Sequence, residues 1–193
     1  MADKAPVQPR ILVLGVGNPL MLDDGLGPRV IELLRAGYDY PENVELIDAG
    51  TMSFMILNIV SEADHMIVVD AIKDTDLPAG TVLRLTPEQM SPNQVRHSGH
   101  DTRLVDVLQA ALMMGKMPET IAIGVQIEEI REFVVELSPS VEAAVPIAAA
   151  AVLDELVRLG IYPTPNQGAL DVNAQIIASM RTYSPMPDTA SEK

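Results

Sequence analysis

Three aspartates and one histidine are the residues best placed to do chemistry. Asp23 and Asp24 lie in GVGNPLMLDDGLGP, residues 15–28, between the apolar run ILVL and the helical pattern RVIELLRAG. Asp70 lies in the apolar run HMIVVDAI, and His100 lies in RHSGHDTRL. Two bare carboxylates about 4 Å apart repel by roughly 4 kcal/mol at an effective dielectric constant near 20, so such a pair needs a shared proton or a cation. Two carboxylates and an imidazole would form a ligand set suited to nickel, zinc or a similar divalent ion.

Each of these residues also has a purely structural interpretation. Asp23 or Asp24 could solvate a loop, and Asp70 could cap a helix or a turn. A histidine in a loop is more often exposed than bound to a metal, and His97 competes with His100 for the ligand role. The chain contains no cysteine, so a metal site would have to use histidine and carboxylates. The residues alone leave both interpretations open.

The opening loop begins like a nucleotide-binding turn and then departs from it. Gly15 and Gly17 match the first two glycines of G-x-G-x-x-G, but Leu20 stands at the third position. Asp48 follows Gly17 by about 30 residues rather than the roughly 20 expected of a ribose-binding acid. The two aspartates also bring negative charge where a phosphate needs N–H groups and positive potential. A nucleotide-binding module therefore remains only an alternative.

Length and charge limit the classes of protein to which the chain can belong. Its 193 residues fit one domain with a full core. The net charge of -14 and the pI near 4.4 argue against nucleic acid or an anionic membrane surface as a partner, because both would repel it. No apolar run approaches the roughly 18 residues of a spanning helix, and the N-terminus lacks the apolar region of a signal peptide. We therefore expect a cytoplasmic protein without membrane insertion.

Apolar runs of strand length alternate with segments of helical period along the chain. This alternation is typical of a parallel sheet with crossover helices, and it predicts an α/β fold, a three-layer α/β/α sandwich with a mostly parallel central sheet. The strands are expected at residues 10–16, 43–50, 65–72 and 120–127, with an edge strand within 73–85.

Helix signals separate these strands. One helix is expected from Pro28 to Gly37, and a second after an N-cap at Ser53. A third is expected after Asp101, with one apolar face formed by Leu104, Val107, Leu108, Ala111 and Leu112. The fourth should run from the N-cap Ser138 to residue 160, and Pro146 should kink it or remove one hydrogen bond. Residues 1–9 are expected to be a flexible N-terminus and residues 10–162 the domain. The extension 163–193 could form one helix within 169–183 before a disordered end.

The predicted topology brings the candidate residues together. In open parallel sheets the ligand site lies beyond the carboxyl ends of the strands, where successive crossovers leave in opposite directions. If strand 10–16 is flanked by the next two strands, the crevice opens between it and strand 65–72. Asp24 follows the first of these strands and Asp70 ends the second, so both carboxylates would reach the crevice. His100 precedes a helix that should pack on the sheet, which leaves its imidazole able to point at the strand ends.

The sequence also resembles the hydrogenase maturation endopeptidases, which trim the C-terminus of the large subunit of nickel-iron hydrogenases. The resemblance covers most of residues 10–160 and rests on ILVLGVGNPLMLDDGLGPRVIE, DAGT, HMIVVDAI, GHDTRLVDVL and LSPSVEAAVP. It implies that Asp24, Asp70 and His100 contact the metal and that the two aspartates are catalytic. The family has Glu or Asp at the first position, and this chain has the shorter Asp, so Asp23 is a possible substitute.

The resemblance further implies how the metal takes part. Nickel would arrive in the substrate, the precursor of the hydrogenase large subunit, and would serve as the recognition element rather than as a permanent cofactor. The turn formed by Gly15, Gly17 and Asn18 would let the loop come close to the bound substrate. Two further alternatives stay open here: a chaperone that senses the metal-loaded precursor without cutting it, and a peptidase of similar fold that acts on another protein.

Overall fold

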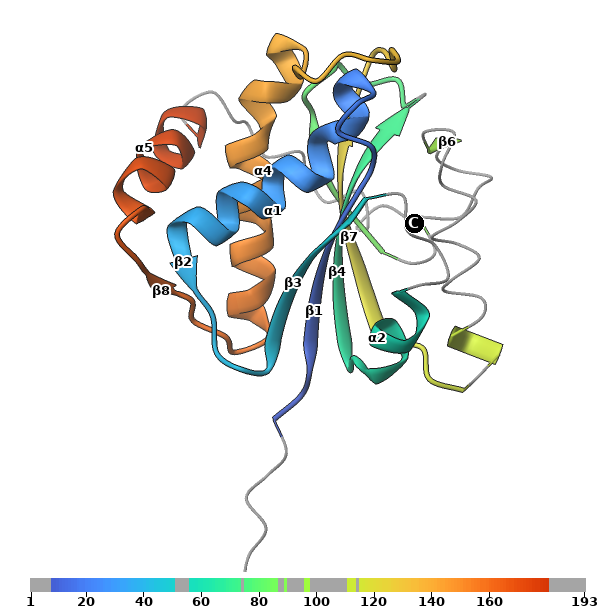
Figure 1. Cartoon of the computed structure of the whole chain (residues 1–193), viewed down its shortest axis with the longest axis vertical. Helices are drawn as coiled ribbons and strands as arrows, with labels where there is room; N and C mark the ends of the chain where they lie inside the picture. Colours follow the sequence, from blue (N-terminus) through green and yellow to red (C-terminus); the bar gives the residue numbers. More distant parts are fainter. Residues whose placement is uncertain are drawn as a thin grey trace, which may run out of the picture.

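A mixed β-sheet forms the centre of the computed structural model, which describes residues 8–50, 56–73, 75–86, 89, 96–97, 111–113 and 115–180 (Figure 1). The strand order is β3-β1-β4-β7-β5, and β6 pairs with β4 outside this path. The first three pairings are parallel, whereas β5 runs antiparallel to β7 and β6 antiparallel to β4. The strands are β1 (Ile11–Val16), β3 (Val44–Gly50), β4 (His65–Lys73), β5 (Val82–Leu85), β6 (Arg96–His97) and β7 (Glu119–Gln126).

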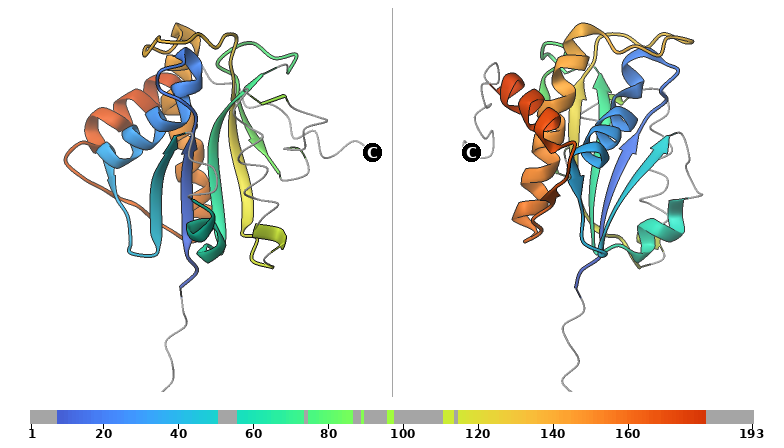
Figure 2. Two further views of the ribbon diagram at one scale, coloured as in Figure 1. Left: turned by 45° about the vertical axis from the view of Figure 1, so that its right-hand side comes forward. Right: turned by 60° about the vertical axis from the view of Figure 1, so that its left-hand side comes forward.

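Helices cover both faces of the sheet (Figures 1 and 2). Helices α1, α4 and α5 lie on one face, and α2 lies on the other. Their bounds are α1 Leu26–Gly37, α2 Leu57–Glu62, α4 Pro139–Arg158 and α5 Ala169–Met180, with the 3-10 turn η1 at Leu22–Gly25 and a small antiparallel pair of β2 (Tyr38–Asp39) and β8 (Thr164–Pro165). The predicted three-layer α/β/α fold is confirmed. None of the helices in the described part of the chain is long and apolar enough to span a bilayer.

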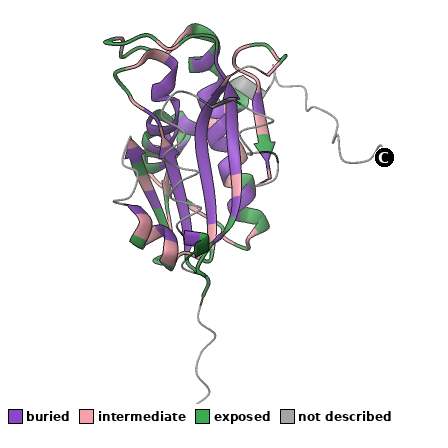
Figure 3. Ribbon diagram, turned by 90° about the vertical axis from the view of Figure 1, so that its right-hand side faces the viewer, coloured by how far each residue is buried: buried purple, intermediate pink, exposed green. Residues whose placement is uncertain are grey.

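The central strands β1 and β4 consist mostly of apolar residues, as expected of strands whose two faces are both buried (Figure 3). In β4, Met66, Val68 and Ile72 belong to the core on the α2 side, while Ile67 and Val69 belong to the core under α1 and α4. Alternation along the strand assigns Asp70 to the α2 side. Strand β1 lies between β3 and β4, as the crevice argument requires.

The predicted helices α1 and α5 are confirmed, whereas the predicted N-cap of α4 needs a correction. Helix α1 ends at Gly37 as expected, and α5 lies within the segment where one more helix was expected. Pro146 lies inside α4. Ser138 occupies the N-cap of α4, but its side chain makes no capping hydrogen bond. The prediction of a capping serine is therefore wrong in its chemistry, because the hydroxyl is used elsewhere.

Other predictions fall at the edge of the described residues. Ser53 lies outside them, and α2 begins at Leu57. Of the helix expected after Asp101, the structure describes 111–113. Ala111 is fully buried in the core on the α2 side, but Leu112 is 62% exposed, so its assignment to the apolar face is wrong.

Candidate active site

The loop between β1 and α1 is fixed by close backbone contacts at two glycines. A Cβ on Gly17 would lie 1.9 Å from the backbone oxygen of Asp24, and the φ of Gly17 is +132°, which only glycine adopts readily. A Cβ on Gly15 would lie 2.4 Å from the backbone oxygen of Gly27. Both Gly15 and Gly17 are buried. The two glycines thus place the loop, and their predicted contact with substrate stays a prediction.

Asp24 lies in η1 and is fully buried. Its Oδ2 accepts a hydrogen bond of 2.8 Å from the backbone N–H of Asn18, whose own Oδ1 accepts one of 3.0 Å from the N–H of Leu20. Asn18 therefore braces the turn with both its backbone and its side chain. This hydrogen bond fixes the carboxylate of Asp24 against its own loop.

The start of α1 meets the end of β4 next to Asp70. A Cβ on Gly27 would lie 2.1 Å from the oxygen of Val16 and 2.8 Å from the oxygen of Val69, so the chain at Gly27 packs tightly against both strand ends. Asp70 follows directly and is only 4% exposed, and its Oδ1 accepts a 2.8 Å hydrogen bond from the N–H of Ala71. The structure therefore brings the segments that carry Asp24 and Asp70 together at the carboxyl edge, between β1 and β4.

Asp23 points to a different partner from Asp24. Its Oδ1 accepts a 2.7 Å hydrogen bond from the N–H of Ser138, and its Oδ2 accepts one of 3.0 Å from the Ser138 hydroxyl. Asp23 is fully buried, as Asp24 is, so the interpretation that these residues solvate a loop is wrong. A carboxylate at the start of α4 is also stabilised by the helix dipole. Asp23 thus joins η1 to α4. The Ser138 hydroxyl is bound to Asp23, which explains why it makes no capping hydrogen bond in α4.

The histidine of the predicted triad, His100, lies outside the described residues. Strand β6 places the backbone of His97 opposite Ile72, at the carboxyl edge of β4. His65 begins β4 at the other end, where its Nδ1 lies 3.3 Å from the carboxylate of Glu119. Within the described part of the chain, no three His, Cys, Asp or Glu side chains group closely enough to hold a metal ion. The role of His100 stays a prediction.

A second loop, residues 128–137, packs along η1 and was not predicted to contribute. Met21 and Val134 form a parallel β-bridge, and the N–H of Leu22 donates a 2.7 Å hydrogen bond to the oxygen of Val134. Leu22 and Phe133 both have a positive φ, at 52° and 62°. The sequence signal was the run EEIREFVVE, in which apolar residues stand among glutamates without strand or helix periodicity.

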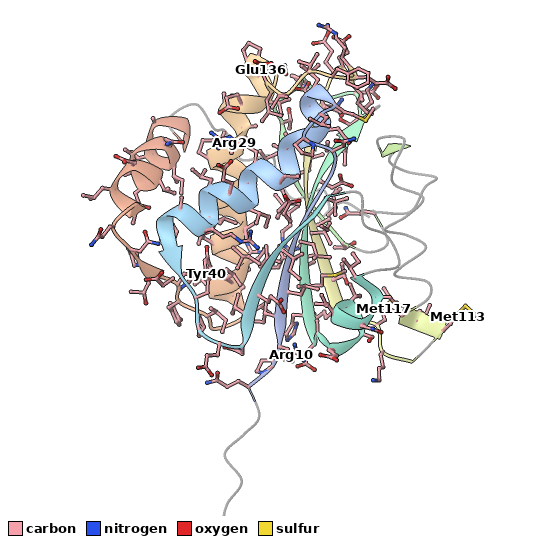
Figure 4. The ribbon with its side chains drawn as sticks, in the orientation of Figure 1. Arg10, Arg29, Tyr40, Met113, Met117 and Glu136 are labelled. Atoms are coloured by element: carbon pink, nitrogen blue, oxygen red, sulfur yellow. The ribbon has the colours of Figure 1, made fainter. Side chains whose placement is uncertain are left out.

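A cleft of about 790 Å³ opens beside these two loops. Pro19 and Asp48 line it, and so do Arg29 and Glu136, which are labelled in Figure 4. The guanidinium of Arg29 lies 2.7 Å from the carboxylate of Glu32. The cleft therefore joins the β1–α1 loop, the end of β3 and the approach to α4 in one surface.

The same geometry disfavours the nucleotide-binding alternative. Leu20, which stands at the third glycine position, is 54% exposed. The chain places the buried carboxylates of Asp23 and Asp24 directly before α1. A phosphate at that helix start would meet negative charge.

Known proteins resemble this chain over most of its length. A family model described as hydrogenase maturation protease matches residues 28–155. The hydrogenase 2 maturation protease of Escherichia coli K12 is 35% identical over 165 residues, which cover 84% of this chain and 99% of that protein. The hydrogenase expression/formation protein HupM of Azotobacter chroococcum is 38% identical over 164 residues, covering 83% and 78%.

Solved structures agree with these relatives. The hydrogenase maturating endopeptidase HybD from Escherichia coli superposes with a TM-score of 0.75 at 37% identity, covering 81% of this chain and 98% of that one. The NiFe hydrogenase maturation protease HybD from Thermococcus kodakarensis gives a TM-score of 0.64 at 27% identity, covering 76% and 98%. Sequence, family model and fold therefore agree that this chain is a peptidase and belongs to the hydrogenase maturation protease family.

Proposed function

We propose that this peptidase removes a C-terminal peptide from the nickel-loaded precursor of a nickel-iron hydrogenase large subunit. The observation that carries the proposal is that the segments carrying two buried aspartates, Asp24 and Asp70, pack together at the edge between β1 and β4. A relative of known structure is named for a NiFe hydrogenase, which supports the substrate class. The reaction would take place in the cytoplasm.

Nickel serves here as a property of the substrate. Carboxylate oxygens and an imidazole nitrogen are suitable donors for a divalent nickel ion, and Asp24, Asp70 and His100 supply that set. An unloaded precursor offers these side chains no cation, so the enzyme would distinguish loaded from unloaded precursor. Because Asp24 and Asp70 are buried, their carboxylates would have to become accessible when the substrate binds.

The aspartates also account for the chemistry of peptide hydrolysis. One carboxylate, of Asp24 or Asp70, takes a proton from a water molecule as that water adds to the scissile carbonyl carbon. The C–N bond then breaks, and the proton passes to the leaving amine, so that a carboxylate and an amine leave the site. A positioned general base of this kind contributes roughly 10²- to 10⁴-fold to the rate.

The decisive experiment is mass spectrometry of the precursor after incubation with the protein, with and without nickel. We expect the loaded precursor to lose the mass of a short C-terminal peptide and the unloaded precursor to stay intact. An unchanged mass with every cognate loaded precursor would refute the proposal, and a stable complex without mass loss would favour a metal-sensing chaperone. Equal cleavage of both forms would point to a peptidase that ignores nickel.

The variant Asp70→Asn tests the assignment of the site. The amide oxygen can still accept the N–H of Ala71, so the fold should be retained, while the negative charge and the base are lost. We expect kcat/KM for the loaded precursor to fall at least about 100-fold. Asp154→Asn, at an exposed position of α4, is the matched control and should cleave like the wild type. Full activity of Asp70→Asn would remove Asp70 from the site.

A further inference from the structure

Three apolar side chains are exposed at the end of the molecule that carries Asp24. Leu20 is 54%, Phe133 88% and Val135 64% exposed, and we name these residues the Phe133 patch. Figure 4 labels Glu136, the neighbour of Val135, on the loop at this end of the sheet, and Figure 3 shows that the loops there are largely exposed. Exposed apolar groups gathered in one place mark interaction surfaces more often than single ones do.

The patch is continuous with the candidate active site. Leu20 belongs to the same loop as Asp24, and its N–H is bound to Asn18, which also holds the Asp24 carboxylate. The bridge between Met21 and Val134 sets Leu20 beside Phe133. A partner bound to this patch would therefore lie close to Asp24, the proposed catalytic residue.

The backbone at Phe133 is strained while its side chain faces solvent. A φ of 62° is a genuine outlier for a bulky aromatic residue, and such strain persists only where surrounding bonds hold the chain in place. Here the Leu22–Val134 hydrogen bond and the two bonds between Asp23 and Ser138 flank it. Strained residues of this kind cluster at functional sites.

The charge around the patch indicates the chemistry of its partner. The loop carries four glutamates and one arginine: Glu128, Glu129, Glu132, Glu136 and Arg131. The Arg131 guanidinium is bound to Glu129 at 2.6 and 3.1 Å, and this contact lowers the pKa of Glu129. With Arg131 and Glu129 paired, Glu128, Glu132 and Glu136 leave the loop with a net negative charge. An apolar centre with an acidic rim is complementary to an apolar segment that carries lysine or arginine.

We propose that the Phe133 patch docks a segment of the substrate polypeptide that combines apolar side chains with lysine or arginine, next to the bond that is cut. This inference rests on the proposed peptidase function and adds the surface by which the protein part of the substrate is bound. Contacts at the patch take no part in breaking the peptide bond, so they would lower KM by stabilising the ground state and the transition state equally.

The variant Phe133→Gly tests the inference directly. It removes the ring and relieves the positive φ, so the melting temperature should stay equal or rise. With the nickel-loaded precursor we expect KM to rise at least tenfold and kcat to change less than twofold. Leu170→Ala on α5, where the side chain is 82% exposed, is the matched control and should leave both constants unchanged. An unchanged KM for Phe133→Gly would overturn the inference while the peptidase function stands.

Charge and self-association provide two further readouts. The double variant Glu132→Gln and Glu136→Gln should raise KM and weaken its dependence on salt, whereas Glu42→Gln with Glu45→Gln should not. If the wild-type protein cleaves no precursor, docking can be measured alone by titrating the loaded precursor against the Asp70→Asn variant, with and without Phe133→Gly. Equal affinities of these two variants for the precursor would overturn the docking inference. A wild-type dimer that Phe133→Gly dissociates in sedimentation would assign the patch to a second copy instead.

Discussion

At the scale of single residues, Gly17 determines where Asp24 can lie. Its amide donates a 3.1 Å hydrogen bond to the oxygen of Gly50, and the space of a Cβ is already filled by the backbone of Asp24. The turn is therefore held between β3 and η1 from both sides. A side chain at residue 17 would have to push η1 away from the strand ends.

We predict that Gly17→Ala lowers the free energy of unfolding by about 3 kcal/mol and reduces kcat/KM for the precursor, because both the positive φ and the contact with Asp24 oppose a methyl group. Gly115→Ala separates the two effects. Gly115 has a φ of +68°, but no atom lies within 4 Å of the position of its Cβ. That variant should lose only about 1 kcal/mol and keep its activity. Denaturant unfolding measures the loss of stability of the two variants, and the cleavage assay measures their activity.

The two neighbouring aspartates show how far sequence can predict single residues. Topology and resemblance both selected Asp24 and Asp70, and the structure places their segments together. The sequence could not show which of Asp23 and Asp24 is bound to the start of α4. That choice depends on a bond from Asp23 to Ser138, a residue distant in sequence, and no local pattern encodes such a contact.

At the scale of elements, the pair Asp23 and Ser138 joins η1 to the start of α4. Both carboxylate oxygens are used, and the contact is buried on the aspartate side. The loop 128–137 precedes α4 in the chain and is bound to η1 through Val134. The candidate site is thus supported from α4 as well as from β1.

We predict that Asp23→Ala lowers the free energy of unfolding by about 3 kcal/mol, since two hydrogen bonds to a charged group are lost. Ser138→Ala keeps the N–H bond and should lose about 1 kcal/mol. Asp23→Asn should recover most of the activity that Asp23→Ala loses, because an amide can still accept the N–H and pair with the hydroxyl. Equal kcat/KM for Asp23→Ala and the wild type would show that η1 holds its position without α4.

The central elements were predictable and the connecting ones were not. Strands β1, β4 and β7 are buried on both faces and consist mostly of apolar residues, so their positions in the sequence could be predicted, whereas the place of β7 beside β4 was not predicted. The edge strand β5 was predicted only as part of a longer segment. Loop 128–137 carries no periodic signal, because its conformation depends on the bridge between Met21 and Val134.

At the scale of the whole molecule, the chain after α4 packs back onto α1. A Cβ on Gly37 would lie 2.8 Å from the side chain of Val172, and one on Gly168 would lie 2.1 Å from the oxygen of Ala36. The Tyr38 hydroxyl donates a hydrogen bond to Asn173 of α5. Helix α5 is therefore an integral part of the layer formed by α1 and α4.

Alkaline pH should weaken this arrangement through Tyr40. Burial, and then the neighbouring Tyr38, raise the pKa of Tyr40 well above its ordinary value of 10, and its hydroxyl donates to the oxygen of Leu34 at 3.2 Å. The unfolded chain ionises first, so the stabilisation is complete below pH 10 and is lost as pH rises above it.

We therefore expect the unfolding free energy of the wild type to fall above pH 10 by up to about 1 kcal/mol per pH unit more steeply than that of Tyr40→Phe. At neutral pH the variant should be less stable by about 1 kcal/mol, because the hydrogen bond is gone. Tyr162→Phe, with a side chain 74% exposed, should follow the wild-type curve. Parallel curves for Tyr40→Phe and the wild type would contradict this account.

The distance in sequence between Asp23 and Ser138 has a consequence for biosynthesis. The two residues are 115 positions apart, so η1 gains its second anchor only after the chain has been synthesised beyond Ser138. Strand β7 joins the sheet almost as late. A nascent chain therefore carries Asp23 long before the chain can supply its partner, and the peptidase would acquire its full activity only after Ser138 has been synthesised.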